Sequence, residues 1–142
     1  MKISARNKLE GTISAVNIGP VSTEVVLDLA GGDKLVAIVT SESAKKLGLA
    51  KGKKAVGLVK APLVTVLTDA GNYKFSARNQ LAGKVTKVTK GGVNSEVSIS
   101  LPGGNVISAV VTNEAVSELQ LAAGKSAIAL IKASHVILGV AA

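Results

Sequence analysis

The chain has 142 residues, of which 47% are hydrophobic and 18% charged. This is a globular composition, which excludes a disordered segment and leaves room for one domain or two small ones. With no Cys, one His and two aromatic residues, the chain has no disulfide scaffold, thiolate or multi-His metal site, or base-stacking platform. The 17 basic and nine acidic residues give a net charge of +8, which favours an anionic partner.

Targeting segments are not visible in the sequence. The apolar runs are far shorter than the roughly 18 residues that a membrane-spanning helix needs. The N-terminus, Met1 to Arg6, lacks the apolar stretch of a signal peptide. We therefore expect a cytoplasmic protein without a membrane partner.

An internal duplication organises the chain. A shift of 72 residues aligns positions 3–70 with 75–142 without a gap, and 29 of the 68 aligned pairs are identical. Such a repeat indicates two copies of one structural unit. We predict two domains, residues 1–70 and 71–142, joined by a short junction at 69–74 that cannot hold them far apart.

Each repeat is predicted to consist mainly of short strands. Val21, Thr23 and Val25 alternate with polar residues, a period of two that is typical of a strand with one buried face. Turns are expected at residues 31–33 and 102–105, which are rich in Gly. The predicted strands cover residues 11–18, 21–29, 35–39, 55–60 and 63–67, then 83–88, 93–101, 106–111, 127–132 and 136–140. We expect the last two strands of each repeat to close their own unit.

One short helix is predicted in each repeat, after Thr40 and after Thr112. Thr is a good N-cap, and Glu42 and Glu114 in the first turns suit the helix dipole. The predicted fold is all-β, with two tandem OB-like five-stranded barrels that each carry one short helix. A small barrel with so few aromatic residues buries little apolar area, so we expect a homo-oligomer.

Small polar and basic residues are shared by the two repeats. Apolar packing does not explain these identities, whereas a tetrahedral oxyanion would be recognised by a guanidinium, an ammonium, hydroxyls and the free N–H groups of a helix start. The set that we select contains no carboxylate, which argues against a cation. Its members are Ser4, Arg6, Asn7, Thr40 and Lys60, with Ser76, Arg78, Asn79, Thr112 and Lys132. An alternative interpretation is that the basic groups only form ion pairs with Glu24 or Glu42.

Other functions receive less support. An OB barrel with this charge is a candidate for binding single-stranded nucleic acid, but Tyr73 and Phe75 cluster at the junction instead of forming a stacking surface. Gly124-Lys125-Ser126 resembles the end of a phosphate loop whose first Gly is replaced by Leu119. His135 is matched by Leu63 in the other repeat, and no base, nucleophile and orienting group recur together. We therefore do not expect an enzyme.

Three motifs in a fixed order give the chain a family resemblance. Ser4-Ala5-Arg6-Asn7, Thr40-Ser41-Glu42-Ser43 and Leu58-Val59-Lys60-Ala61-Pro62 resemble the Mop domain of the molbindins, a family of molybdate-binding proteins. The second repeat carries Ser76-Ala77-Arg78-Asn79 and Lys132-Ala133-Ser134, so the resemblance covers essentially the whole chain twice. The DNA-binding and ATPase segments to which this module is joined in some relatives are not seen here.

The resemblance implies an OB-like fold, a trimer of two-domain chains, and molybdate or tungstate bound at interfaces between Mop units without redox chemistry or direct protein–metal bonds. It implies a role in molybdenum homeostasis, storage or buffering. The implied oxyanion contacts are Ser4, Arg6, Thr40, Ser43, Lys60, Ala61, Ser76, Arg78, Thr112, Lys132 and Ala133. Ala115 stands where Ser43 stands, so one hydroxyl is missing in the second repeat. The resemblance also implies sites on the threefold axis, for which residues 19–22 and 91–94 are our candidates.

Overall fold

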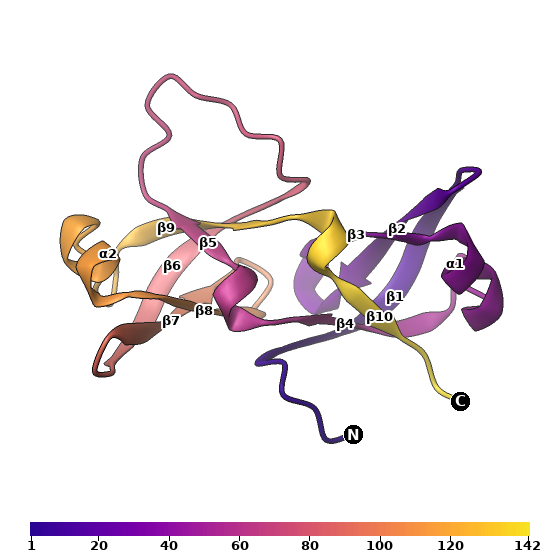
Figure 1. Cartoon of the computed structure of the whole chain (residues 1–142), viewed down its shortest axis with the longest axis horizontal. Helices are drawn as coiled ribbons and strands as arrows, with labels where there is room; N and C mark the ends of the chain where they lie inside the picture. Colours follow the sequence, from indigo (N-terminus) through magenta and orange to yellow (C-terminus); the bar gives the residue numbers. More distant parts are fainter.

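The computed structural model describes residues 1–142 as two five-stranded sheets that lie side by side along the long axis of the molecule (Figure 1). The elements of the first repeat are β1 (Asn7–Ile18), β2 (Ser22–Leu29), β3 (Lys34–Thr40), α1 (Ser41–Leu47), β4 (Lys54–Val59), the 3-10 turn η2 (Ala61–Leu63) and β5 (Thr65–Leu67). Those of the second are β6 (Asn79–Lys90), β7 (Asn94–Ser100), β8 (Val106–Thr112), α2 (Asn113–Glu118), β9 (Ser126–Ile131), the 3-10 turn η3 (Ala133–His135) and β10 (Ile137–Gly139). A further 3-10 turn, η1 (Ala30–Gly32), joins β2 to β3. The predicted all-β, tandem OB-like fold is confirmed.

The strands form because alternate residues face one apolar core in each half. In β2, Val25, Leu27 and Leu29 are buried while their neighbours are partly exposed, and β7 repeats the pattern. β1 and β6 start at Asn7 and Asn79, four residues earlier than the predicted strands at 11 and 83. A bulge in β1 between Ile13 and Ala15 shifts the register with β2, and β6 has one at the matching place. Such bulges increase strand bend and twist, which lets one long strand serve two sides of a barrel.

The short helices are positioned by the threonines that precede them. The Thr40 side chain accepts a hydrogen bond from the Ser43 N–H at 3.1 Å, and Thr112 accepts one from the Ala115 N–H at 3.0 Å. Both threonines have extended backbone, as N-cap residues do. The predicted helices after Thr40 and Thr112 are therefore present, at the outer ends of the two sheets (Figure 1).

The last strand of each repeat does not close its own unit, contrary to our expectation. The sheet orders are β10-β4-β1-β2-β3 and β5-β9-β6-β7-β8, so β5 pairs with β9 and β10 pairs with β4. The physical reason is the connection: a single 3-10 turn at Ala61–Leu63, with Pro62 in it, carries the chain onward instead of reversing it into a hairpin. Figure 1 shows β5 and β10 crossing in opposite directions between the halves.

Two buried asparagines complete the contact between the halves. The Asn7 amide donates to the Ser108 carbonyl at 2.8 Å and accepts from the Ser108 N–H at 2.7 Å. The Asn79 amide makes the same pair of hydrogen bonds with the backbone of Val36, also at 2.8 and 2.7 Å. Each asparagine is 2% exposed. Asn7 and Asn79 therefore act as short substitutes for a strand at the outer edges of β8 and β3.

The turns of the two halves also meet, and Gly31 lies at the closest point. Gly31 has φ of +77°, and a Cβ placed there would overlap the backbone of Gly103. From the turn of the second half, the Asn105 side chain donates to the Ala30 carbonyl and to the Asp33 carboxylate of the first half, each at 2.8 Å. Gly31 is therefore required for two reasons: its positive φ is unfavourable for other residues, and no space is left for a side chain.

We expect Gly31→Ala to lower the free energy of unfolding by more than Gly32→Ala does. Gly32 also has positive φ, but nothing lies within 4 Å of its added Cβ, so this control isolates the backbone strain. Strain of this kind costs about 1–3 kcal/mol, and Gly31→Ala adds the overlap with Gly103. Thermal unfolding of both variants measures the difference. Equal losses would show that the contact between the turns does not contribute to stability.

Candidate functional site

The predicted arginine and lysine of each repeat lie at equivalent positions, next to the ends of paired strands. Asn7 and Val59 are register partners in the β1–β4 ladder, so Arg6, which precedes one, and Lys60, which follows the other, emerge from the same end of that ladder. In the second half Asn79 pairs with Ile131, which places Arg78 and Lys132 in the same relation. The fold therefore brings the predicted arginine and lysine of each repeat together.

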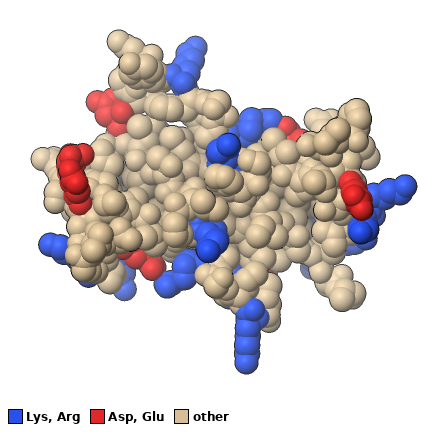
Figure 2. All heavy atoms as spheres, in the orientation of Figure 1, with Lys and Arg blue, Asp and Glu red and all other residues tan.

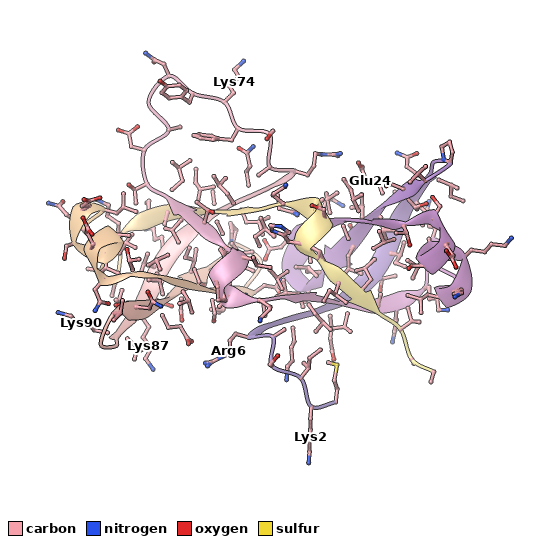
Figure 3. The ribbon with its side chains drawn as sticks, viewed as in Figure 1. Lys2, Arg6, Glu24, Lys74, Lys87 and Lys90 are labelled. Carbon is pink, nitrogen blue, oxygen red and sulfur yellow. The ribbon has the colours of Figure 1, made fainter.

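Both arginines bind carboxylates of the opposite half. Arg6 Nη2 donates to Glu96 Oε1 at 3.0 Å, and Arg78 donates through both Nη atoms to the carboxylate of Glu24. The pair with Glu24 raises the pKa of Arg78 above its ordinary value through the hydrogen bonds and the opposite charge. In Figure 3 the labelled Arg6 and Glu24 lie at opposite edges of the molecule, as two such pairs related by the repeat require.

The alternative interpretation, ion pairs with Glu24 or Glu42, thus holds for Arg78, whereas Arg6 is ion-paired with Glu96 and the two lysines are in no ion pair. Glu24 is bound by Arg78, whereas Glu42 is bound by Lys46 within α1 at 3.5 Å. Lys60 and Lys132 are exposed and take part in none of the four ion pairs of the chain. Two ammonium groups are therefore available to a ligand without any rearrangement.

The hydroxyls and alanines of the predicted set fall into two classes. Thr40 and Thr112 cap their helices, and Thr40 Oγ1 also donates to Ser43 Oγ at 2.8 Å. Ser4, Ser43 and Ser76 are exposed. Ala61 and Ala133 are 1% and 3% exposed, so their methyl groups belong to the core and only their backbone can face a ligand.

The fold groups these residues across the repeats. Glu24, the partner of Arg78, is paired with Ile38 on β3, and Thr40 lies two residues further along that strand on the same outer face. Such diagonal neighbours lie about 7–8 Å apart. The turn η3, which follows Lys132, also contacts β3. Arg78 and the turn that follows Lys132 therefore both contact the β2–β3 side of the first repeat, where β3 ends at Thr40.

The second cluster has the same plan with one hydroxyl fewer. Glu96, the partner of Arg6, is paired with Val110 on β8, two residues before Thr112. The turn η2 after Lys60 contacts β8. Arg6 and the turn that follows Lys60 therefore both contact the β7–β8 side of the second repeat, where β8 ends at Thr112, and Ala115 stands where the first repeat has Ser43.

Of the residues that hold this arrangement, only Glu24 is predicted from the sequence as an ion-pair partner; the structural contacts of Glu96, Asn7 and Asn79 are not predicted. Glu24 and Glu96 are identical between the repeats, so the shared set does contain carboxylates, contrary to our selection. Asn7 and Asn79 belong to the polar set selected above as ligand candidates, but their amides are fully used by backbone groups of the other half. The signal for both pairs is their identity in the two repeats, which does not distinguish a structural contact from a ligand contact.

Other features of the surface lie apart from the two clusters. A hollow of about 810 Å³ is lined by residues such as Met1, Glu10 and Val140 and contains none of the eleven predicted contacts. Residues 19–22 and 91–94, the candidates for axial sites, form the tips of the β1–β2 and β6–β7 hairpins near opposite ends of the molecule (Figure 1). On the face in Figure 2, basic side chains are spread over both halves with acidic groups among them.

The chain holds no cluster of three or more His, Cys, Asp or Glu side chains that suits a metal ion. No helix is long and apolar enough to cross a membrane. His135 is half-buried in η3, and its Nδ1 has no hydrogen-bond partner.

Comparison with known proteins agrees with the repeat and the fold. The TOBE domain family matches residues 3–66 and again 76–138. A crystal structure of the cytoplasmic molybdate-binding protein ModG, with molybdate bound, has a TM-score of 0.95 and 55% sequence identity over 99% of this chain and 100% of that chain.

Two of the curated relatives are about twice as long as this chain. The molybdenum transport protein ModE of Herbaspirillum seropedicae is 43% identical over 140 residues, and the molybdenum-pterin-binding protein MopA of Rhodobacter capsulatus is 41% identical over 138 residues. These matches cover 99% and 97% of this chain but 52% of each relative, so the chain spans about half the length of the curated relatives it matches. The chain belongs to the TOBE-domain family and carries two tandem copies of the domain, as a two-domain molbindin.

Proposed function

We propose that the chain binds molybdate, or tungstate, reversibly at the two clusters described above. This proposal is supported by the recurrence in both repeats of an arginine and a lysine at one end of a strand pair, with the lysine in no ion pair, on the side of the other repeat whose edge strand leads into a capped helix. ModG, which is similar over its whole length, binds molybdate. Guanidinium and ammonium groups with hydroxyl and backbone donors suit a tetrahedral dianion.

Each group has a distinct role in this proposal. Arg6 and Arg78 donate paired hydrogen bonds to oxyanion oxygens, and Lys60 and Lys132 add a compact positive charge. Ser4, Ser43, Ser76, Thr40 and Thr112 supply hydroxyls, while Ala61 and Ala133 contribute through the backbone. All contacts are to oxygen, with no protein–metal bond. The cluster that contains Ala115 has fewer hydroxyl donors and is expected to bind more weakly.

We further propose that the two Mop domains correspond to residues 1–70 and 71–142, each sheet being completed by the last strand of the other repeat. We also propose that the working form is a homotrimer and that the oxyanion sits where Mop units meet. The two clusters are exposed in the single chain, and in a trimer residues of another chain would supply further contacts to the ligand and exclude water from it. The role that we propose is storage or buffering of molybdenum in the cytoplasm, because reversible binding suits a buffer and the similar ModG is described as cytoplasmic. The nucleic-acid alternative gains no support, because Tyr73 and Phe75 lie in the segment between β5 and β6 and not on a strand face.

Isothermal titration of the full chain tests this function. Molybdate and tungstate are expected to bind with heat, and the Lys60→Ala variant to lose affinity by about 10- to 100-fold or to lose half of the sites. A charge pair at 4 Å is worth roughly 4 kcal/mol at an effective dielectric of 20, before desolvation reduces it. Lys54→Ala is the control, because Lys54 is exposed at the other end of the same strand.

Thermal unfolding supplies a second readout of the same proposal. Molybdate at 100 times its dissociation constant is expected to stabilise the fold by about 2.7 kcal/mol, and sulfate and phosphate at equal concentration measure selectivity. Absence of heat and of stabilisation with molybdate, together with tight binding of single-stranded DNA, would replace this function by the nucleic-acid alternative.

A further inference from the structure

The carboxylates that bind the two arginines are present in both repeats, as the arginines are. Glu24 and Glu96 occupy the same position of the repeat, and each is bound by the arginine of the opposite half. The Glu24 and Glu96 side chains are 24% and 30% exposed, against 50% and 62% for Arg78 and Arg6. Each carboxylate is thus less exposed than its arginine, and it extends from a strand that has a neighbour on each side.

We propose that Glu24 and Glu96 set the affinity of the two oxyanion sites, because each carboxylate occupies the arginine that the oxyanion needs and must be displaced when it binds. This inference rests on the proposed function. It assigns to the glutamates a competing role in binding and not a contact with the ligand.

The chemistry of the guanidinium supports competition. A carboxylate offers two oxygens to the paired N–H groups of an arginine, and a tetrahedral oxyanion offers two oxygens in a similar way. Arg78 uses both Nη atoms on Glu24. An oxyanion that takes the same paired hydrogen bonds must therefore replace Glu24 at Arg78, and at Arg6 it must replace the single hydrogen bond from Nη2 to Glu96.

The charges at each cluster support displacement over sharing. With the carboxylate in place, the arginine, the lysine and the glutamate sum to a charge of about +1, and a dianion would meet a neighbouring negative group. With the carboxylate moved away, the arginine and the lysine together match the dianion. A glutamate that stayed beside the ligand would weaken binding and leave its own hydrogen bonds unmade.

The test compares molybdate binding by the full chain and by Glu24→Gln and Glu96→Gln. Gln keeps the length of the side chain and removes the charge, and exposed ion pairs contribute little to stability, so the fold is expected to persist. We expect each variant to bind molybdate about tenfold more tightly at one of the two kinds of site, with stoichiometry unchanged. Glu10→Gln is the matched control, because it changes the net charge equally and Glu10 belongs to none of the ion pairs.

A second variant separates competition from a general effect of charge. In an Arg78→Gln background, Glu24→Gln is expected to give no gain in affinity, since no guanidinium remains to be released. A gain that persists there, or an equal gain in Glu10→Gln, would overturn the proposal. Unchanged or weaker binding in Glu24→Gln and Glu96→Gln, with normal binding by the unaltered chain, would overturn it as well. Failure of the unaltered chain to bind molybdate would instead remove the proposed function itself, and this inference with it.

Discussion

Residues 1–72 expressed alone are expected not to fold as a monomer. The first sheet would lose β10, which pairs with β4 through Ile137, Leu138 and Gly139. The fragment's own β5 would have no β9 to pair with. Val136 and Leu138, which are buried in the common core, would leave with the second half, while Val64 and Val66 would be exposed.

The expected loss is large compared with the stability of a small domain. Burial of one Val or Leu side chain contributes about 1.5–3 kcal/mol, and domains of this size are stable by about 5–15 kcal/mol in total. Four such side chains and two strand pairings are affected by the cut. The exposed edge of β4 also becomes a template for another strand, so we expect the fragment to pair with a second copy by mutual exchange of β5.

Light scattering and circular dichroism over a range of concentrations check this result. The 1–72 fragment is expected to be unfolded when dilute and dimeric when folded, and an equal mixture with residues 73–142 to form a stable heterodimer. The control is the full chain cleaved by a protease within residues 69–74, which severs no strand and is expected to remain assembled. A folded monomeric fragment with the melting temperature of the full chain would contradict the strand exchange.

Much of the local structure follows from the sequence because its causes are local. The alternation around Val25 predicts β2, and the same pattern around Val97 predicts β7. The threonine caps predict both helices, since a side-chain oxygen three residues before a free N–H is a short-range feature. The candidate lysines and arginines stand out because they are basic residues that are identical in the two repeats, and apolar packing does not explain that identity.

The exchange of the last strands cannot be predicted from the sequence, because the two repeats are similar in sequence. Because β4 and β9 are similar in sequence, β5 is compatible with either of them, and alternation says nothing about which is its partner. Only the 3-10 turn at Ala61–Leu63, which carries the chain forward, decides between the two. The cross-half contacts of Arg78 with Glu24 depend on that exchange, so they cannot be predicted before it is known.

Replacement of Asn7 by Ala is expected to destabilise the fold more than any loss of a surface ion pair. The Asn7 amide donates to the carbonyls of Val59 and Ser108 and accepts from the Ser108 N–H. Alanine would leave the backbone groups of Ser108 without these partners in a site that is 2% exposed at Asn7. Each buried polar group without a partner costs about 1–3 kcal/mol, so we expect a loss of roughly 2–5 kcal/mol in the free energy of unfolding.

The matching variant Asn79→Ala is expected to lose a similar amount, because Asn79 makes the same two hydrogen bonds with Val36. Denaturant unfolding measures both, with Asn17→Ala as the control: Asn17 is exposed on β1, and that change should stay within about 0.5 kcal/mol. If the exchanged strands make one cooperative unit, each variant still unfolds in a single transition. Two separate transitions, or a loss below about 1 kcal/mol in both variants, would contradict this expectation. Either result would mean that β5 and β10 alone join the halves, and that Asn7 and Asn79 are identical in the two repeats for another reason.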